Sequence, residues 1–327
     1  MIGVHSGNLC GWGEQLLVDE EKIERSKFTA QKLLGKDASR LDNLCLEKPL
    51  GQPDLNFESF SIALHDLVAK ARSIPLYKLW GVPLRTTIPM MPCIFPENDK
   101  VASAKAREYS DAGFTNLKMK LMGDVDQDIK NIRAVKRQAP TCTLQGDVNG
   151  GYQFNDLANG LLFELRRHGL DIIEDPCKGE PSEYKKLCLP AGPKIMIDKI
   201  ARNDALLKET LKIKGCDMVN FHPCQQGTLS HLLKRASWCA KKGCIHVIGG
   251  TGFIGAGSAA YRHLSALVAG YLPCGSTNGS FDHGQPILID QPVFRNGFAE
   301  LNNNPGHGAN VDINRLAPYL NTRDIIG

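Results

Sequence analysis

The most regular hydrophobic pattern in the first part of the chain lies between residues 57 and 71. Apolar side chains recur there mostly at steps of three and four, at Phe57, Phe60, Leu64, Leu67, Val68 and Ala71. This spacing places them on one face of a helix, so we predict a buried amphipathic helix. A second helix is predicted over residues 20–34, because Gly35 can adopt the left-handed conformation that ends many helices. The glycines of residues 10–14, CGWGE, indicate a turn or a close approach between backbones.

Beyond a stretch rich in proline and glycine near residues 83–89, short apolar runs alternate with segments of helix length. This alternation predicts parallel strands joined by helices. The expected strands cover residues 90–94, 116–119, 143–146, 171–173, 195–197, 218–221 and 245–248, with a weaker one at 272–274. That number suits a closed barrel of the TIM type, so we predict an α/β fold. The segment after Pro286 has no further unit of this kind and is expected to return to the first domain.

Three of the expected strands end abruptly in a carboxylate, at Asp147, Glu174 and Asp198. The steps are 174 − 147 = 27 and 198 − 174 = 24 residues, and each interval holds one segment of helix length. Because the carboxyl ends of parallel barrel strands meet at one face, the three side chains should point toward one place. A set of oxygen ligands with room for water suits Mg²⁺. The alternative is that each acid caps the helix after its strand, but the shared position at strand ends favours a Mg²⁺ site.

Lys118 and Lys120 stand at the end of the strand before Asp147, at a step of 147 − 120 = 27 residues. Alternate residues of a strand share a face, so both lysines should point into the barrel mouth. Buried lysines need charged partners, and a metal-bound carboxylate substrate would be one. Lys118 and the cation would favour the neutral form of Lys120, which could then act as a base. A solvated pair of lysines at a loop edge is the alternative.

His222 follows the next strand after Asp198, at a step of 222 − 198 = 24 residues. It should face Lys120 across the barrel, on the other side of a substrate held by the metal. Imidazole changes its charge near neutral pH, which makes His222 a candidate acid or base. The alternative is a structural histidine that hydrogen-bonds its neighbours.

The composition narrows the class of protein. With 327 residues the chain can form one barrel of about 250 residues and a small second domain. A net charge of +4 gives no reason to expect a nucleic-acid or membrane partner. The sequence also lacks a long uninterrupted apolar run and the profile of a signal peptide, so we expect a cytoplasmic protein.

Eleven cysteines are scattered along the chain without a CxxC pair. This spacing suits neither a structural zinc site nor a small disulfide scaffold, and most of the thiols are expected to be reduced core residues. Cys177 and Cys224 each follow an expected strand end. We assign both to packing, because neither has an evident base nearby in the sequence.

The order and spacing of these motifs resemble the enolase superfamily, in its mandelate racemase and muconate lactonizing enzyme family. The resemblance is to the branch that includes the muconate-lactonizing and dipeptide-epimerase groups. It rests on K-x-K at 118–120, D-x-N at 147–149, E-D-P at 174–176 and the strand-end Asp198. Three further segments extend it over nearly the whole chain: GWGE at 11–14, ALHDLVAKARSIPLYKLWG at 63–81 and NPGHGANVD at 304–312.

This resemblance implies an α+β capping domain, residues 1–88, on a modified (β/α)₇β barrel, residues 89–290, with residues 291–327 returning to the cap. It implies Mg²⁺ as cofactor and removal of a proton alpha to a carboxylate, which gives an enediolate. Asn149 and Asp282 are the expected substrate-binding residues. The expected partners are a small-molecule carboxylate substrate and further copies of the chain in a homo-oligomer.

Several positions depart from the family pattern. His222 stands where the muconate-lactonizing and dipeptide-epimerase groups have a second lysine, in N-x-K-P. The mandelate racemase group has a histidine at the end of strand seven, where Gly249 and Gly250 stand here. Lys199 replaces the usual acid after Asp198, and we expect its cation to lie beside the metal. Gly284 lies in the eighth-strand segment, where dipeptide epimerases have acids that hold the substrate ammonium group, so it weakens an assignment to dipeptides. The chain also begins at what resembles the third strand of the capping sheet, so the first strands and the specificity loop are expected to be missing.

The leading hypothesis is therefore a racemase, epimerase or cycloisomerase of a small carboxylic acid or amino-acid derivative. Lys120 and His222 would be its acid and base groups on opposite sides of the substrate. A hydroxy-acid dehydratase is the first alternative, in which a second acid assists the departure of hydroxide. A degenerate barrel that binds a metal and a carboxylate without turnover is the second.

Overall fold

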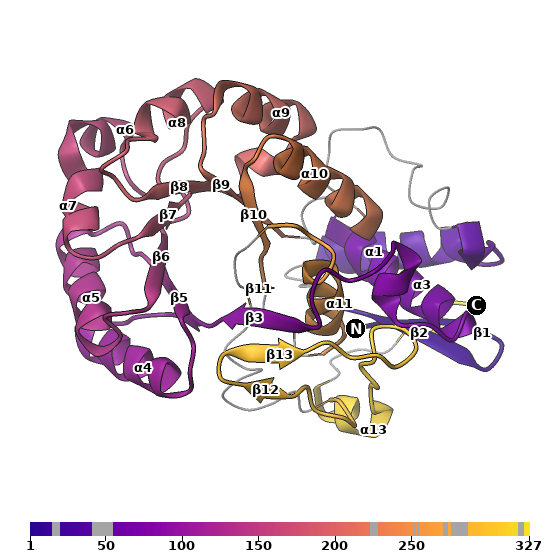
Figure 1. Cartoon of the computed structure of the whole chain (residues 1–327). Helices are drawn as coiled ribbons and strands as arrows, with labels where there is room; N and C mark the ends of the chain where they lie inside the picture. The colour runs from indigo at the N-terminus through magenta and orange to yellow at the C-terminus, as the bar shows by residue number, and fades with distance from the viewer. Residues whose placement is uncertain are drawn as a thin grey trace.

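The computed structural model describes residues 1–14, 20–40, 55–222, 228–250, 253, 255–270, 274–275, 287–319 and 324–327. Its main feature is a curled sheet of seven parallel strands in the order β10-β9-β8-β7-β6-β5-β4, with helices along its outer side (Figure 1). The strands are β4 (Cys93–Ile94), β5 (Asn116–Lys120), β6 (Thr143–Asp147), β7 (Ile172–Glu174), β8 (Lys194–Ile197), β9 (Met218–Phe221) and β10 (Ile245–Ile248). Neighbours in the sheet are neighbours in the chain, so the predicted α/β barrel architecture is confirmed.

The helices that cover the outer side lie in the segments that follow the strands. They are α4 (Asp99–Asp111), α5 (Val125–Gln138), α6 (Phe154–Asp156), α7 (Leu162–Arg167), α8 (Pro181–Leu187), α9 (Asp204–Ile213), α10 (Leu229–Lys241) and α11 (Ala256–Ser265). Polar residues cap several of them: Asp124 accepts from the Gln127 N–H, and Thr228 accepts from the His231 N–H. Such caps satisfy backbone groups that the first turn leaves unpaired.

The single strand expected over residues 90–94 is wrong, because two strands of different sheets meet there. β3 (Thr87–Met91) belongs to a four-stranded sheet, in which it pairs with β13 (Phe298–Glu300) and β11 (Cys274–Gly275). β12 (Phe294–Arg295) pairs with β13 at the edge of that sheet. The chain changes sheets at Pro92, which has no N–H to donate to a ladder.

The N-terminal residues form the hairpin of β1 (Ile2–Ser6) and β2 (Leu9–Gly13), followed by α1 (Glu20–Leu33) and α3 (Leu55–Ala71). Both predicted helices are confirmed, and Gly35 has the expected left-handed conformation, with φ 68°. The glycines of β2 allow a close approach to α3, as the sequence indicated. A Cβ on Gly11 would lie 2.0 Å from the carbonyl oxygen of Ala63, and one on Gly13 would lie 1.8 Å from that of Ser59.

We predict that Gly13→Ala lowers the stability of the protein by about 1–3 kcal/mol or more, because β2 must move away from α3. Thermal unfolding followed by circular dichroism would measure the change in Tm. Gly3→Ala is the matched control on β1, where the nearest atom to a new Cβ is an outer ring atom of Trp12 at 3.1 Å. Equal Tm values for the two variants would contradict the prediction.

Two buried contacts join the N-terminal part of the chain to later parts. The Glu14 carboxylate accepts from the N–H groups of Gly255 and Gly257, both at 3.0 Å, at the start of α11. The His307 N–H donates to Asp66 on α3 at 2.9 Å. Residues 301–319 thus lie against the N-terminal part, with α13 (Ile313–Leu316) near their end. The domain limits at residues 88 and 290 stay a prediction.

Inside the curled sheet the side chains form layers, because alternate residues of a strand face the same way. A small apolar cluster of Ile172, Met196, Met218 and Val247 forms one layer. Two residues further along the same strands stand Glu174, Asp198, Asn220 and Gly249. The apolar layer therefore supports a polar layer at the carboxyl ends of the strands.

None of the described helices is long and apolar enough to cross a membrane.

Candidate active site

The carboxyl ends of five successive strands, β5 to β9, carry the residues singled out from the sequence. Lys120, Asp147 and Glu174 are paired side by side in the register of β5, β6 and β7. Asp198 and His222 directly follow β8 and β9. Parallel pairing with a helix in each connection puts all of these ends on one face of the barrel, as the spacing predicted.

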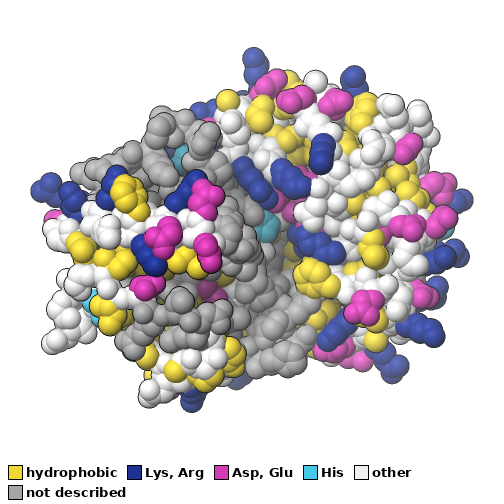
Figure 2. All heavy atoms as spheres, turned by 180° about the vertical axis from the view of Figure 1, so that it is seen from behind, with side chains coloured by type: hydrophobic (Ala, Val, Ile, Leu, Met, Phe, Trp, Pro, Cys, Tyr) yellow, Lys and Arg dark blue, Asp and Glu magenta, His cyan; other side chains and the backbone are white. Residues whose placement is uncertain are grey.

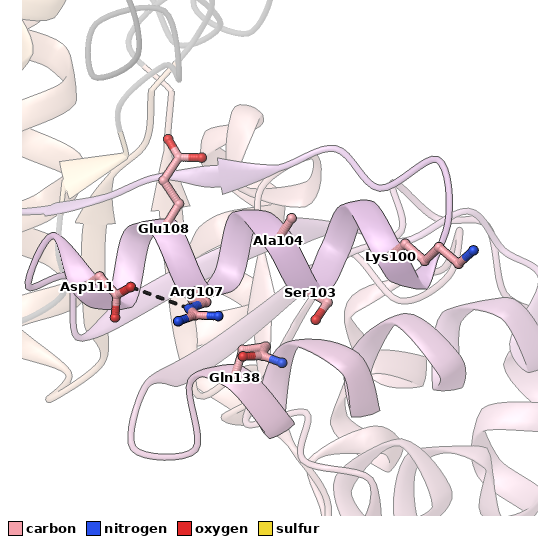
Figure 3. Close-up of a pocket in the computed structure, with 7 residues that line it drawn as sticks. All are labelled: Lys100, Ser103, Ala104, Arg107, Glu108, Asp111 and Gln138. Carbon is pink, nitrogen blue, oxygen red and sulfur yellow. Dashed lines mark ion pairs between the residues drawn. The ribbon is translucent and has the colours of Figure 1, made fainter.

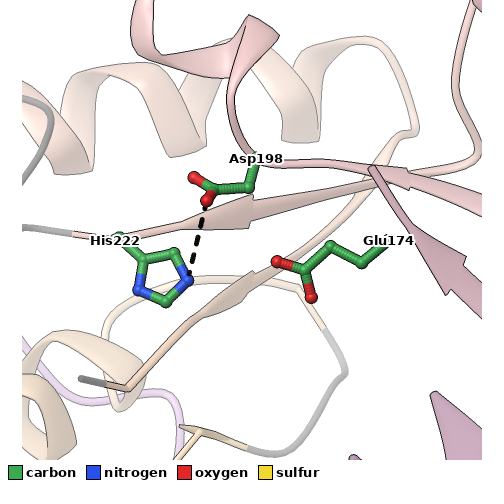
Figure 4. A group of neighbouring side chains, drawn as sticks. All are labelled: Glu174, Asp198 and His222. Atoms are coloured by element: carbon green, nitrogen blue, oxygen red, sulfur yellow. Dashed lines mark ion pairs between the residues drawn. The ribbon is translucent and has the colours of Figure 1, made fainter. Parts of the chain in front are cut away.

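Three of these residues form a group that could hold a metal ion. One ligand atom each from Glu174, Asp198 and His222 lies within 4.8 Å of the others, and all three residues are buried. Figure 4 shows the imidazole ring and the Glu174 carboxylate turned toward each other, with Asp198 beside them. The distance from His222 Nε2 to Asp198 Oδ2 is 4.0 Å.

Asp147 is bound to two lysines in this arrangement. Lys118 Nζ lies 2.9 Å from Asp147 Oδ2 and 2.7 Å from Glu174 Oε2, so its ammonium group bridges the two carboxylates. Lys120 Nζ lies 2.5 Å from the same Asp147 oxygen and donates to Asn149 Oδ1 at 2.9 Å. The sequence grouped Asp147 with Glu174 and Asp198, whereas the group of possible metal ligands in the described residues combines His222 with that pair. The assignment of Asp147 as a metal ligand stays a prediction.

Burial and neighbouring charges act against each other in this cluster. Burial lowers the pKa of Lys118, but the charges of Glu174 and Asp147 outweigh it, and the pKa lies above its usual value. Burial raises the pKa of Asp147, whereas Lys118 and Lys120 lower it, and the net result is a low pKa. The pKa of His222 is lowered by burial, which Asp198 only partly offsets. Near neutral pH the structure thus holds a charged lysine between carboxylates and a neutral imidazole.

Two amides that the sequence reasoning missed hold the Glu174 carboxylate. Gln145 Nε2 donates to Oε2 at 2.5 Å, and Asn220 Nδ2 donates to Oε1 at 2.9 Å. Each amide stands two residues before a predicted site residue, Asp147 or His222, so the period-two rule could have found them. Asn220 Nδ2 also lies 3.1 Å from His222 Nε2. Among the described residues, Asn220 Oδ1 and His222 Nδ1 have no hydrogen-bond partner.

The cation that pairs with Asp198 is an arginine, and the position of Lys199 beside a metal stays a prediction. Arg202 Nη2 lies 2.7 Å from Asp198 Oδ2, at the end of the 3₁₀ turn Ile200–Arg202. The Lys199 ammonium donates instead to the carbonyl oxygen of Asn149. The turn brings Arg202 back to Asp198, four positions earlier in the chain. The sequence motif did not indicate this contact.

Asp175 holds the chain after β8 in place. It has a positive φ of 43°, and its carboxylate accepts from the N–H groups of Asp198 at 3.0 Å and Lys199 at 3.2 Å. Burial and the charge of Asp198 raise the pKa of Asp175 to about 7. The E-D-P motif thus places one carboxylate in the site and uses the next to orient the neighbouring strand end.

Gly249 gives the imidazole its space. A Cβ at this position would lie 2.3 Å from Asn220 Oδ1 and 2.8 Å from two ring atoms of His222. A histidine here, as in the mandelate racemase pattern, would collide with His222. The two departures from the family pattern are therefore linked, because the glycine after β10 leaves room for the histidine after β9.

Three other expectations concern residues near this face. Asp282, expected to bind substrate, lies outside the described residues, as does Cys224. Cys177 is buried, and burial raises the pKa of its thiol to about 11, which agrees with a packing role. Asn149 has a left-handed φ of 53°, and its side-chain oxygen accepts a hydrogen bond from Lys120, so it lies at the site mouth. Its role toward a substrate stays a prediction.

The molecular surface gathers positive charge near a hollow. On the face shown in Figure 2, lysine and arginine side chains lie along one edge of a hollow in which a histidine side chain is visible. A second, shallow groove lies between α4 and α5 (Figure 3), where Arg107 and Asp111 are 3.7 Å apart and largely exposed. No residue of the site lines that groove.

Comparison with known proteins agrees with this geometry. Residues 101–315 match the family model described as Enolase C-terminal domain-like. The chain belongs to this family and so to the enolase superfamily, in the mandelate racemase and muconate lactonizing enzyme family. The resemblance drawn from the sequence motifs is thereby confirmed.

Two relatives and one solved structure illustrate the similarity. The chain is 26% identical over 295 residues to an L-Lys-D/L-Arg epimerase of Methylococcus capsulatus, covering 84% of this chain and 78% of that protein. It is 26% identical over 330 residues to a chloromuconate cycloisomerase of Pseudomonas sp. strain P51, covering 98% and 88%. The structure of muconate lactonizing enzyme from Pseudomonas fluorescens complexed with muconolactone superposes with a TM-score of 0.87 at 20% identity, covering 96% and 88%. These relatives are isomerases, an epimerase and a cycloisomerase, which confirms the expected class, an isomerase of this superfamily.

Proposed function

We propose that this protein is a Mg²⁺-dependent enzyme that removes the proton alpha to the carboxylate of a small substrate and forms a racemised, epimerised or cyclised product. The observation that carries the proposal is the placement of two proton-transfer groups around one set of buried acids. Lys120 ends β5 and His222 follows β9, four strands further along the curled sheet. A racemase needs two such groups, one for each side of the reacting carbon.

The donor set fits a divalent cation. Glu174 and Asp198 are only 1% and 4% exposed, and carboxylate oxygens are the ligands that Mg²⁺ prefers. We propose Asp147 as the third ligand. When bound, Mg²⁺ would neutralise the negative charge that develops on the substrate carboxylate as the alpha proton leaves.

The protein's own residues have separate tasks in this proposal. Lys118, buried between Asp147 and Glu174, keeps a positive charge beside the place where a substrate carboxylate would lie. The amides of Gln145 and Asn220 fix the orientation of the Glu174 carboxylate. Such fixed dipoles and charges stabilise a developing negative charge without reorganisation.

Proton transfer is the task of Lys120 and His222. Lys120 Nζ takes the alpha proton from one side in its neutral form, and His222 gives a proton to, or takes one from, the other side. Asn149, which receives Lys120, and Asp282 orient the substrate. The ammonium groups of Lys120 and Lys199, which both contact Asn149, place positive charge that favours an anionic substrate.

Exchange of the alpha proton for deuterium tests this function. The purified protein with Mg²⁺ in D₂O is incubated with dipeptides and with lactones of unsaturated dicarboxylates, classes suggested by the two relatives and by the muconolactone of the similar structure. Loss of the alpha-proton signal in ¹H NMR, abolished by EDTA, is the expected result. Absence of exchange with every compound, while calorimetry detects bound Mg²⁺, would favour the non-catalytic barrel.

A further inference from the structure

Three cysteines meet at the end of the barrel that lies opposite to the site. Cys216 stands two residues before β9, Cys244 directly precedes β10, and Cys239 lies in the last turn of α10. The site residues occupy the other ends of the same strands. The end of α10 and the pairing of β9 with β10 bring Cys244 next to both Cys239 and Cys216.

The contact between Cys239 and Cys244 follows from the way α10 ends. The Cys244 N–H donates to the Cys239 carbonyl at 2.9 Å, and the Gly243 N–H donates to that of Ala240 at 3.0 Å. Gly243 has the left-handed φ of 66° that this pair of bonds requires. These are the features of a Schellman motif, in which the side chains at the two positions occupied here by Cys239 and Cys244 come into contact. The backbone therefore holds these two thiols together.

The contact with Cys216 comes from the pairing of β9 and β10. Ile245 is opposite Met218 in the parallel register, so Cys244 lies beside Asp217, and its thiol donates to the Asp217 carbonyl at 3.5 Å. Cys216 directly precedes Asp217 in the chain. Cys244 thus stands between one cysteine from the adjacent strand and one from its own preceding helix.

Exposure and charge make Cys244 the reactive member. Cys239 is fully buried, whereas Cys216 and Cys244 are partly exposed, so a small oxidant can reach them. Hydrogen bonds from the two neighbouring thiols lower the pKa of Cys244, and the same bonds, together with burial, raise the pKa of the two donors. A thiolate in the cluster therefore forms first at Cys244, and the thiolate is the nucleophile in thiol chemistry.

A zinc site would need three thiolates at mutual distances that fit one ion. Among the described residues, the group whose three ligand atoms all lie within 4.8 Å of one another is Glu174, Asp198 and His222, at the other end of the barrel. Cys244 instead neighbours Cys239 through the end of α10 and Cys216 through the strand register. This arrangement favours pairwise chemistry over a shared metal.

We propose that Cys244 is a site of reversible oxidation, which forms a disulfide with either Cys239 or Cys216. The oxidant is a peroxide. The Cys244 thiolate attacks one oxygen of hydrogen peroxide, the O–O bond breaks, and the products are a sulfenic acid and hydroxide, which takes up a proton to become water. The thiol of the second cysteine then attacks the Cys244 sulfur, an S–S bond forms, the S–O bond breaks, and a second water leaves with the thiol proton. Two thiols are oxidised by two electrons and one peroxide is reduced to two waters.

Differential alkylation tests the proposal. The reduced full-length protein is treated with hydrogen peroxide, denatured in N-ethylmaleimide, reduced, and labelled with iodoacetamide before peptide mass spectrometry. We expect the second label on Cys244 and, in complementary fractions, on Cys216 or Cys239, and unreduced digests should contain the two cross-linked peptides. Cys142 and Cys177, buried elsewhere, are internal controls that should keep the first label.

Single serine variants identify the shared sulfur. Cys216→Ser should leave only the link between Cys239 and Cys244, Cys239→Ser should leave only the other link, and Cys244→Ser should remove both. If Cys244→Ser does not fold, the double variant Cys216→Ser/Cys239→Ser should instead give a Cys244 sulfenic acid that dimedone traps.

Four results would overturn the proposal. They are full retention of the first label on Cys244, a cross-link from Cys244 to any other cysteine, a link between Cys216 and Cys239 in Cys244→Ser, and one equivalent of zinc that survives dialysis against EDTA and is lost in that variant.

Discussion

Replacing Lys120 by alanine should stop the exchange of the alpha proton for one enantiomer of a substrate, and replacing His222 by asparagine should stop it for the other. The reason is that the two side chains approach the same buried acids from β5 and from the end of β9, four strands apart. Each can then reach only one side of the alpha carbon. General acids and bases contribute about 10²–10⁴-fold, so each loss should be large and one-sided.

Exchange in D₂O followed by NMR, with each enantiomer and each variant, measures this directly. Lys194→Ala and His231→Asn are matched controls away from the site, where Lys194 lies 3.4 Å from Asp217 and His231 lies 3.1 Å from Asp204. Both should exchange like the unmodified protein. Calorimetry with Mg²⁺ should show unchanged binding in Lys120→Ala, which separates a lost base from a lost metal.

A symmetric loss in His222→Asn would assign a different role to this histidine. It would then hydrogen-bond a substrate oxygen or bind the metal, and Lys120 would be the only base. One-base chemistry, such as dehydration or cycloisomerisation, would follow from that result. The contact of His222 with Asp198 and Asn220 is compatible with either role, so the symmetry of the effect decides between them.

The strand ends could be predicted from the sequence because they depend on a simple repeat. Steps of 27 and 24 residues between carboxylates correspond to one strand and one helix each, and parallel strands bring equivalent positions together. Asp147, Glu174 and Asp198 therefore reach the same face whatever the details of the helices between them. The same reasoning placed His222 correctly after β9.

Side-chain pairing within that face could not be predicted. Lys118 and Lys120 share a face by alternation, but only the curvature of the sheet determines that Lys118 bridges Asp147 and Glu174. The pairing of Arg202 with Asp198 depends on a short 3₁₀ turn that has no clear sequence signal.

Other misses have local causes. The strand expected over residues 90–94 is divided at Pro92, because the residues before and after this proline pair in different sheets. Proline alone does not indicate such a change of sheet, since it also occurs at edges and bulges of a single sheet. The three cysteines of the opposite barrel end are separated in the sequence by 239 − 216 = 23 and 244 − 239 = 5 residues, which matches no common motif. Their meeting requires both the strand register and the end of α10.

Neutralising one carboxylate of the metal site should abolish Mg²⁺ binding and leave the fold intact. Asp198→Asn, Glu174→Gln and Asp147→Asn keep the shape of each side chain and most of its hydrogen bonds, but each removes a charged oxygen ligand from an ion that has few protein ligands. His222→Asn, in contrast, should keep Mg²⁺ affinity within a few fold if the imidazole serves proton transfer. Isothermal titration calorimetry measures the affinity of each variant. Thermal unfolding with and without Mg²⁺ gives a second measure, because an ion at 100 times its Kd stabilises the folded state by about 2.7 kcal/mol.

The comparison between Asp147→Asn and His222→Asn separates the two possible ligand sets. Asp147 is bound by Lys118 and Lys120, so as a ligand it must exchange a lysine contact for the ion, whereas His222 already lies within 4.8 Å of the ligand atoms of Glu174 and Asp198. Unchanged affinity in Asp147→Asn together with lost affinity in His222→Asn would replace the all-carboxylate set by a mixed one. An imidazole ligand would then favour a transition metal over Mg²⁺, since imidazole suits softer ions. Asp171→Asn, which changes an aspartate just before the other end of β7, is the control and should bind Mg²⁺ with unchanged affinity.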